Sequence, residues 1–250
     1  MARFAQSIKG VWFILKTLPV FIVRQTPYRN ADLILTVLSR EGFLTIHARG
    51  ALKITSPFHA MVALGSWSDF TINETKKKAY LEKANLIKFA PLPDQEGLIA
   101  SIVMQVILQI LLLLDENADM AASMYPRLVG VRNGMQSALS TYTTFLLQYL
   151  DVQGVPMIVD YCVQCQSKLK IVGLNPQLGG FICQNCQAKV SSHLLPAEAL
   201  VLMRKLKTIP FGEPVNNSTL KLLLPLIHQH FNFHLDVQLE GFKTIETLIQ

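Results

Sequence analysis

The sequence predicts an α+β multidomain protein: an N-terminal β-barrel, then an all-α helical bundle with an inserted four-cysteine zinc ribbon. Three observations predict this class. Short β-branched runs between turn residues fill the first third of the 250 residues, long apolar segments with helical spacing follow, and the four cysteines form two close pairs. We expect an N-terminal extension at residues 1–17, the barrel at 18–90 and the helical domain at 91–250, with the ribbon at 160–190.

The barrel follows from short apolar runs that turn residues separate. Residues 18–24 and 33–38 are apolar and β-branched, and alternate residues of 43–48 share one face. Residues 61–71 supply further strand material, and 73–78 form a polar, basic turn. Several short strands within about 80 residues are typical of a small β-barrel. We expect the extension to be an apolar arm that packs on this barrel.

The middle of the chain changes its hydrophobic period after Asp94, a candidate helix N-cap. Residues 98–114 carry no charge and are near the lower length limit for a bilayer span. The polar Ser101, Gln105 and Gln109 recur every fourth residue, however, and so share one helix face. We therefore expect a helix buried in the bundle, with a membrane-associated scaffold as the alternative. Further helices are expected at 120–131, 135–150, 196–206 and 218–233.

The cysteines have the spacing C-x2-C-x17-C-x2-C, at Cys162, Cys165, Cys183 and Cys186. A two-residue gap lets both sulfurs of a pair reach one ion at about 2.3 Å, and two pairs complete a tetrahedron. We predict one structural Zn²⁺ per chain, in a closed site without a position for catalysis. Two disulfides, or four unrelated thiols, are the alternatives.

Charge is unevenly distributed along the chain. Residues 1–90 hold 13 Lys or Arg against 5 Asp or Glu, which gives +8, whereas residues 91–250 hold 10 against 12, which gives −2. Such asymmetry suggests a polyanionic partner for the first third, nucleic acid in particular. Ordinary solubility charge is the alternative, and composition alone does not decide between the two.

Cysteine usage and the N-terminus bear on the compartment. Paired thiols suited to a metal indicate a reducing cytosol. The apolar patch at residues 11–15 ends at Lys16 and is shorter than a secretory h-region, so we expect no signal peptide and a cytoplasmic protein that does not use a membrane.

Enzyme signatures are missing from the sequence. It contains no GxxxxGK[ST], HExxH or GxSxG motif, and no H-x-E precedes the cysteines as in zinc deaminases. We therefore expect a binding and remodelling protein rather than an enzyme.

The order of these parts resembles the RecO family of bacterial recombination mediators. Residues 24–33 (RQTPYRNADL) are similar to the family's opening strand and the turn after it. Residues 42–50 (GFLTIHARG) are similar to its signature of a glycine, a strand and Ala-basic-Gly, and Ser56 occupies the place of a family serine. Residues 151–156 and 179–182, each before a cysteine pair, resemble the block that carries the family's zinc motif.

The resemblance implies an OB-fold for the barrel and a role in DNA repair and homologous recombination through the RecF pathway. Family members bind single- and double-stranded DNA, anneal complementary strands and help load recombinase on DNA coated with single-strand-binding protein. The implied partners are a RecR-like protein and the C-terminal tail of single-strand-binding protein, at the bacterial nucleoid. A zinc-ribbon protein that binds RNA or serves transcription is the alternative.

An OB-fold binds nucleic acid with a cationic groove and with aromatic platforms on which bases stack. Our candidate DNA-binding residues are Arg24, Tyr28, Arg29, Arg49, Lys53, Lys76, Lys77 and Lys78. Phe58 and Trp67 are further candidate platforms, with core packing as the alternative. The loop after Gly50 carries one cation, Lys53, where the family carries several, so we expect its contribution to be weaker or to move to the lysine run and Lys83.

Two arginines are the candidate partner site. Arg127 and Arg132 are the only cations between Lys88 and Lys168 in the sequence, and they flank apolar residues. An apolar groove edged by arginine suits an acidic peptide that ends in a bulky residue and a carboxylate, such as the tail of single-strand-binding protein. The alternative site is Arg204, Lys205 and Lys207. We expect His228, His230 and His234 to be bundle histidines rather than a second metal site.

Overall fold

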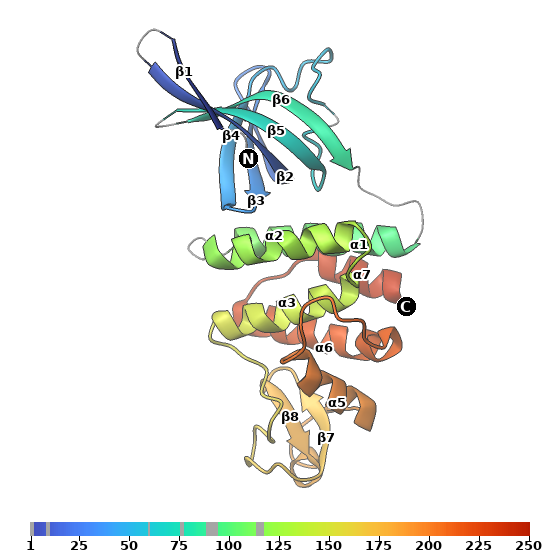
Figure 1. The fold of residues 1–250 in the computed structure, drawn as a ribbon. Coiled ribbons are helices and arrows are strands. Elements are labelled where there is room, and N and C mark those ends of the chain that lie inside the picture. The colour runs from blue at the N-terminus through green and yellow to red at the C-terminus, as the bar shows by residue number, and fades with distance from the viewer. Residues whose placement is uncertain (1–2, 9–10, 60, 76–77, 89–94, 114–117) are drawn as a thin grey trace. The chain divides into compact units, whose positions relative to one another are not determined.

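The computed structural model describes residues 3–8, 11–59, 61–75, 78–88, 95–113 and 118–250. The chain divides into two compact units, residues 1–129 and 130–250 (Figure 1). The first unit contains all six strands of the N-terminal sheet, together with helix α1 and most of helix α2. The boundary between strands and helices near residue 90 therefore does not coincide with the boundary between the units.

The N-terminal unit contains a closed five-stranded barrel. Its order is β2-β3-β4-β6-β5, and the pairing of β2 with β5 closes it. All pairs are antiparallel except β4 with β6, which are parallel. This is the five-stranded Greek-key barrel of an OB-fold and confirms the predicted fold class. The strands are β2 (Val11–Tyr28), β3 (Asp32–Ser39), β4 (Gly42–Ala48), β5 (Trp67–Glu74) and β6 (Ala79–Lys88).

Alternating apolar residues fill the barrel and explain why these segments form strands. In β3 the side chains of Leu33, Leu35 and Val37 point inward and are buried, whereas those between them are partly exposed. A bulge between Ile22 and Arg24 interrupts the register of β2, and bulges increase strand twist where a sheet must bend. The core includes Leu18, Val20, Ile22, Leu33, Leu35, Val37, Ile46, Ala48, Phe70 and Ile72.

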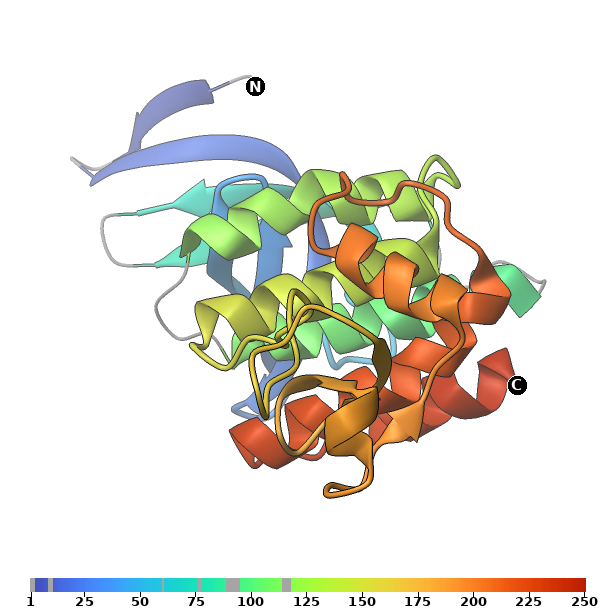
Figure 2. The ribbon, with the colours of Figure 1, turned by 90° about the horizontal axis from the view of Figure 1, so that it is seen from below.

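Three features of this unit differ from the sequence prediction. Strand β1 (Arg3–Ile8) pairs antiparallel with residues 11–16 of β2, and this pair of strands projects from the barrel (Figures 1 and 2). Residues 61–66 form turns rather than a strand, since the hydroxyls of Ser66 and Ser68 both donate to the Met61 carbonyl. Strand β6 was not predicted as a separate element.

Two helices follow the barrel, α1 (Gln95–Leu112) and α2 (Ala118–Arg132). In α1 most apolar residues are buried, whereas Gln105 and Gln109 are exposed, in accordance with a helix in a packed unit. Among the described residues, no helix is long and apolar enough to span a bilayer.

The C-terminal unit is a helical bundle with a small three-stranded ribbon. Ser137 and Asn216 cap the N-termini of α3 and α6 by accepting hydrogen bonds from backbone N–H groups. The bundle core contains Tyr142, Phe145, Phe231 and Phe242, and α6 and α7 lie side by side in both views (Figures 1 and 2). Its helices are α3 (Ala138–Val152), α5 (Ala197–Leu206), α6 (Asn217–Leu235) and α7 (Glu240–Ile249).

The ribbon lies between α3 and α5 in the sequence, as predicted. Its sheet has the order β8-β7-β9, and a short helix, α4 (Gln184–Gln187), follows β8 directly. Gly179, with φ +84°, ends the turn between β7 and β8 in a conformation that favours glycine. The strands are β7 (Ile171–Asn175), β8 (Gly180–Cys183) and β9 (His193–Leu194).

Candidate nucleic-acid interface and metal centre

The four cysteines converge at the end of the ribbon. All four Sγ atoms lie within 4.8 Å of one another, and Cys165 Sγ is 3.6 Å from Cys183 Sγ. Cys162, Cys183 and Cys186 are buried, whereas Cys165 is exposed. The four cysteines of the sequence motif therefore lie close together, and four thiols at such distances could hold one metal ion.

Backbone turns hold each cysteine pair in shape. The Gln166 N–H donates to the Cys162 carbonyl at 2.8 Å, and the Val190 N–H donates to the Cys186 carbonyl at 3.1 Å. Gln166 adopts φ 61°, which reverses the chain directly after Cys165. These backbone features shape the turns that carry the two cysteine pairs.

The thiols influence one another's protonation. Burial raises the pKa of Cys162, but hydrogen bonds from the backbone of Cys183, Cys165 and Gln164 outweigh burial and lower that pKa to about 6. The neighbouring thiols of Cys165 and Cys183, together with burial, raise the pKa of Cys186 to about 12. One thiolate thus makes a second one unfavourable unless a cation compensates, which is the electrostatic situation of a thiolate metal site.

The three clustered histidines take part in hydrogen bonds within the bundle. His228 Nδ1 lies 2.6 Å from Glu246 Oε1, and its Nε2 lies 2.9 Å from the Tyr142 hydroxyl. His230 contacts two carbonyl oxygens with its ring nitrogens, and His234 contacts one. These contacts give the histidines a structural role of the kind that the sequence predicted.

A second cluster lies at one end of the barrel, where three aromatic rings in a row have an arginine at each end. The ring of Tyr28 meets that of His47 at 5.9 Å, and His47 meets Tyr80 at 5.5 Å. Arg29 lies over Tyr28 at 5.1 Å, and Arg49 lies over Tyr80 at 4.3 Å. We call these five residues the aromatic–cation row.

Strand pairing explains why residues so distant in sequence form this row. His47 is opposite Tyr80 in the parallel pair β4–β6, and Tyr28 is opposite Asp32 at the start of β3. The rings are partly exposed and both arginines are exposed. The row therefore presents ring surface and positive charge to solvent, as a site for stacked bases and phosphates requires.

Three loops adjoin residues of the row along the chain, and hydrogen bonds join two of them. Residues 29–31 join β2 to β3, and residue 52 of the β4–β5 loop donates its N–H to the Ala31 carbonyl at 2.9 Å. The Gly50 N–H donates to Asp32 Oδ1 at 2.8 Å. The third loop joins β5 to β6, and Lys78 closes it through hydrogen bonds with Thr75.

The other predicted DNA-binding residues are distributed around this end of the barrel. Arg24 is exposed on β2 and lies four residues before Tyr28. Every second residue of a strand points to the same side, so Arg24 and Tyr28 share one face of β2. Lys53 and Lys78 are exposed in the loops, whereas Lys76 and Lys77 lie outside the described residues. Sequence reasoning missed His47 and Tyr80, although the outward position of His47 in an alternating strand was a usable signal.

The two further candidate platforms have structural roles. Phe58 is partly buried and packs against the barrel core. Trp67 stacks on Phe21 with ring centroids 5.8 Å apart, and its Nε1–H donates to the Tyr125 hydroxyl at 3.2 Å.

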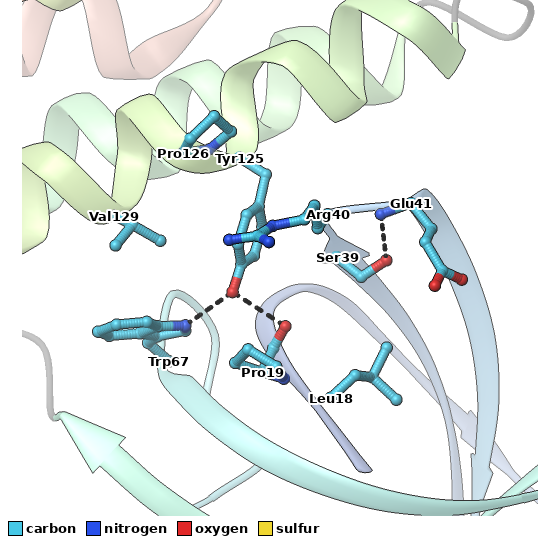
Figure 3. Close-up of a pocket in the computed structure, with 9 residues that line it drawn as sticks. All are labelled: Leu18, Pro19, Ser39, Arg40, Glu41, Trp67, Tyr125, Pro126 and Val129. Atoms are coloured by element: carbon cyan, nitrogen blue, oxygen red, sulfur yellow. Dashed lines mark hydrogen bonds between the residues drawn. The ribbon is translucent and has the colours of Figure 1, made fainter. Parts of the chain in front are cut away.

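Trp67 and Tyr125 also line a cavity of about 310 Å³ (Figure 3). The Tyr125 hydroxyl donates to the Pro19 carbonyl at 3.0 Å, and burial raises the pKa of this tyrosine. The hydrogen bond between the Trp67 indole N–H and the Tyr125 hydroxyl is thus part of the cavity wall. The remaining lining residues are Leu18, Ser39, Arg40, Glu41, Pro126 and Val129.

The predicted partner arginines differ in exposure. Arg127 is partly exposed and donates to Ser123 Oγ at 3.2 Å, whereas Arg132 is only 3% exposed and burial lowers its pKa. Leu128 and Val131, their apolar neighbours, are buried. A role of these arginines in partner binding therefore stays a prediction.

The alternative cations on and after α5 form polar contacts within their unit. Arg204 donates from Nε to the Val159 carbonyl at 2.9 Å, while Lys205 and Lys207 form ion pairs with Glu213 and Asp151.

Comparison with known families covers most of the chain. The family model described as Recombination protein O N terminal matches residues 15–90, and that described as Recombination protein O C terminal matches residues 99–241. The chain is 25% identical to the DNA repair protein RecO of Halalkalibacterium halodurans, over 91% of this chain and 92% of that protein. It is 22% identical to the DNA repair protein RecO of Lactobacillus helveticus, over 99% of both chains.

Proposed function

Because the chain belongs to the RecO family of DNA repair proteins, we propose that it acts as a mediator of homologous recombination. In this proposal it binds single- and double-stranded DNA, anneals complementary strands and helps load recombinase on DNA coated with single-strand-binding protein. It acts by binding rather than by catalysis, in the cytoplasm at the nucleoid. The observation that carries the proposal is the aromatic–cation row at the end of the OB-fold barrel.

The composition of the row suits annealing. Base stacking on aromatic rings is tolerant of sequence, because every base has a π-face, and a protein that pairs arbitrary strands must not select a sequence. Arg29 and Arg49 supply positive charge for phosphates at the two ends of the row. The ring edges of the bases then stay available for pairing with a second strand.

We propose a structural Zn²⁺ at the cysteine cluster, one per chain. Cys162, Cys165, Cys183 and Cys186 would hold it as thiolates, and the ion would supply the positive charge that lets neighbouring thiols ionise together. Four protein ligands complete a tetrahedral site, so the ion would stabilise the ribbon without activating water.

A RecR-like protein and the C-terminal tail of single-strand-binding protein are the proposed partners. The tail is acidic and residues 91–250 carry a net charge of −2, so if the tail docks in this part of the chain we expect it to do so at one of its few groups of basic residues. Arg127 is the more exposed of the two predicted anchors, and Arg204, Lys205 and Lys207 are the alternative.

Strand annealing tests the central proposal. Complementary oligonucleotides coated with single-strand-binding protein are mixed with the wild-type chain, and duplex formation is followed by energy transfer between end labels. The Tyr28→Ala/Tyr80→Ala variant should anneal much more slowly, whereas Phe233→Ala, which removes a 60% exposed aromatic ring from α6, should match the wild type. Wild-type protein that neither binds nor anneals DNA would refute the proposal.

A further inference from the structure

The loop between β4 and β5 exposes an isoleucine completely. Ile54 is 99% exposed and Leu52 is 42% exposed, with Lys53 between them as the single cation between Gly50 and Ser56. Single exposed apolar residues are common on protein surfaces. A β-branched side chain without any cover at a loop tip still gains free energy from whatever surface buries it.

This loop is held in shape by its own backbone. The Lys53 N–H donates to the Gly50 carbonyl, and the Ser56 N–H donates to the Lys53 carbonyl at 2.9 Å. Ala51, which is 1% exposed, packs in the barrel core and anchors the loop from within. Ile54 therefore sits on an ordered turn, so that a ligand meets it with little loss of chain entropy.

The same loop is fastened to the aromatic–cation row. Its first residue, Arg49, lies over Tyr80, and the Leu52 N–H donates to the Ala31 carbonyl in the loop that follows Tyr28. Ile54 thus lies two residues after Leu52, whose backbone is bonded to the loop that follows Tyr28.

We propose that Ile54 is a wedge that packs against an unpaired base where single-stranded and double-stranded DNA meet. This inference rests on the proposed function, and it adds a preference for DNA with unpaired bases beside a duplex. Apolar side chains inserted at a base step disrupt its stacking. The disruption costs least where a base is already unpaired, so a wedge selects such sites over a continuous duplex. Lys53 directly precedes Ile54 in the chain, so in this proposal its ammonium group contacts a phosphate next to the unpaired base.

The test compares a forked oligonucleotide with a blunt duplex of the same length, using the full chain and fluorescence anisotropy. Ile54→Thr keeps the branched shape and removes the apolar character. It should lower affinity for the fork about fivefold or more, and leave affinity for the blunt duplex unchanged. A 2-aminopurine at the fork should brighten on binding of the wild type and much less on binding of the variant.

Leu64→Thr is the matched control. Leu64 is 51% exposed in the same loop, next to Gly65, whose N–H donates to the Ile22 carbonyl. Ile22 lies six residues along β2 from Tyr28, about 20 Å away. This variant should behave as the wild type. Equal fork affinity of Ile54→Thr and wild type would overturn the wedge and leave the proposed function standing, whereas absence of DNA binding by the wild type would overturn both.

Discussion

Replacing Tyr80 by alanine separates stacking from charge in the aromatic–cation row. The substitution removes one platform, and a base stacked on an aromatic side chain contributes about 1–3 kcal/mol, or roughly 5- to 150-fold in Kd. Tyr80 is only partly exposed and its ring also contacts His47, so we expect the lower part of this range, about tenfold. Arg49 loses its aromatic support at 4.3 Å, which adds at most about 1 kcal/mol.

The assay is an anisotropy titration of a labelled single strand at several salt concentrations. Tyr80→Ala should shift all curves by a similar factor and leave the salt slope nearly unchanged, because no cation is lost. Arg49→Ala should instead flatten the slope by about 0.7 for single-stranded DNA.

Two controls belong to this experiment. Tyr80→Phe keeps the ring and should bind as the wild type. Arg40→Ala removes an exposed arginine from the β3–β4 turn, at the other end of the barrel, and should leave the slope unchanged. If Tyr80→Ala bound single strands with wild-type affinity, the rings would not be stacking platforms and the assignment of this face would be wrong.

Four further predictions concern the rest of the chain. Cys183→Ser should lower bound zinc, measured by elemental analysis, from one equivalent to near zero and unfold the ribbon locally; metal-free wild-type protein purified without chelator would contradict the zinc site. Tyr142→Phe leaves a buried nitrogen of His228 without its partner and should cost about 1–3 kcal/mol in urea unfolding. Burial lowers the pKa of His228 in the folded chain, so the unfolded chain binds more protons and the free energy of unfolding should fall as pH drops below about 6.5; His228→Phe should lack this component. An acidic peptide that ends in Phe should bind more weakly, by anisotropy, to Arg127→Ala than to wild type, and unchanged affinity would move that site elsewhere.

The sequence was sufficient to predict those features that depend on residues close to one another along the chain. The cysteine pairs are local in sequence, so their spacing predicted the thiol cluster that the structure contains. Helices α2, α3, α5 and α6 have boundaries within three residues of the predicted ones, because their apolar spacing and their polar caps lie within each segment.

Features that depend on strand pairing were not predictable in the same way. Strand β6 (AYLEKANLIK) mixes charged residues with apolar ones and has a bulge in its pairing with β5, so its alternation is weak. His47 and Tyr80 lie 33 positions apart and meet only because β4 and β6 are parallel neighbours. Likewise, the burial of Arg132 results from tertiary packing that the charge pattern alone does not contain.

The length of β2 has a practical consequence for shortening this protein. Its 18 residues serve three partners in turn, since β1 pairs with its first part, β3 with its last part and β5 with its middle. A chain trimmed to begin at Val11 would keep the barrel but would leave the β1-facing edge of residues 11–16 without its hydrogen-bonding partner. Bare strand edges of this kind recruit other strands, so we expect the trimmed protein to self-associate through β2. A chain that begins at residue 17 would lack that unpaired edge, but it would also lack three of the β2 residues that pair with β5.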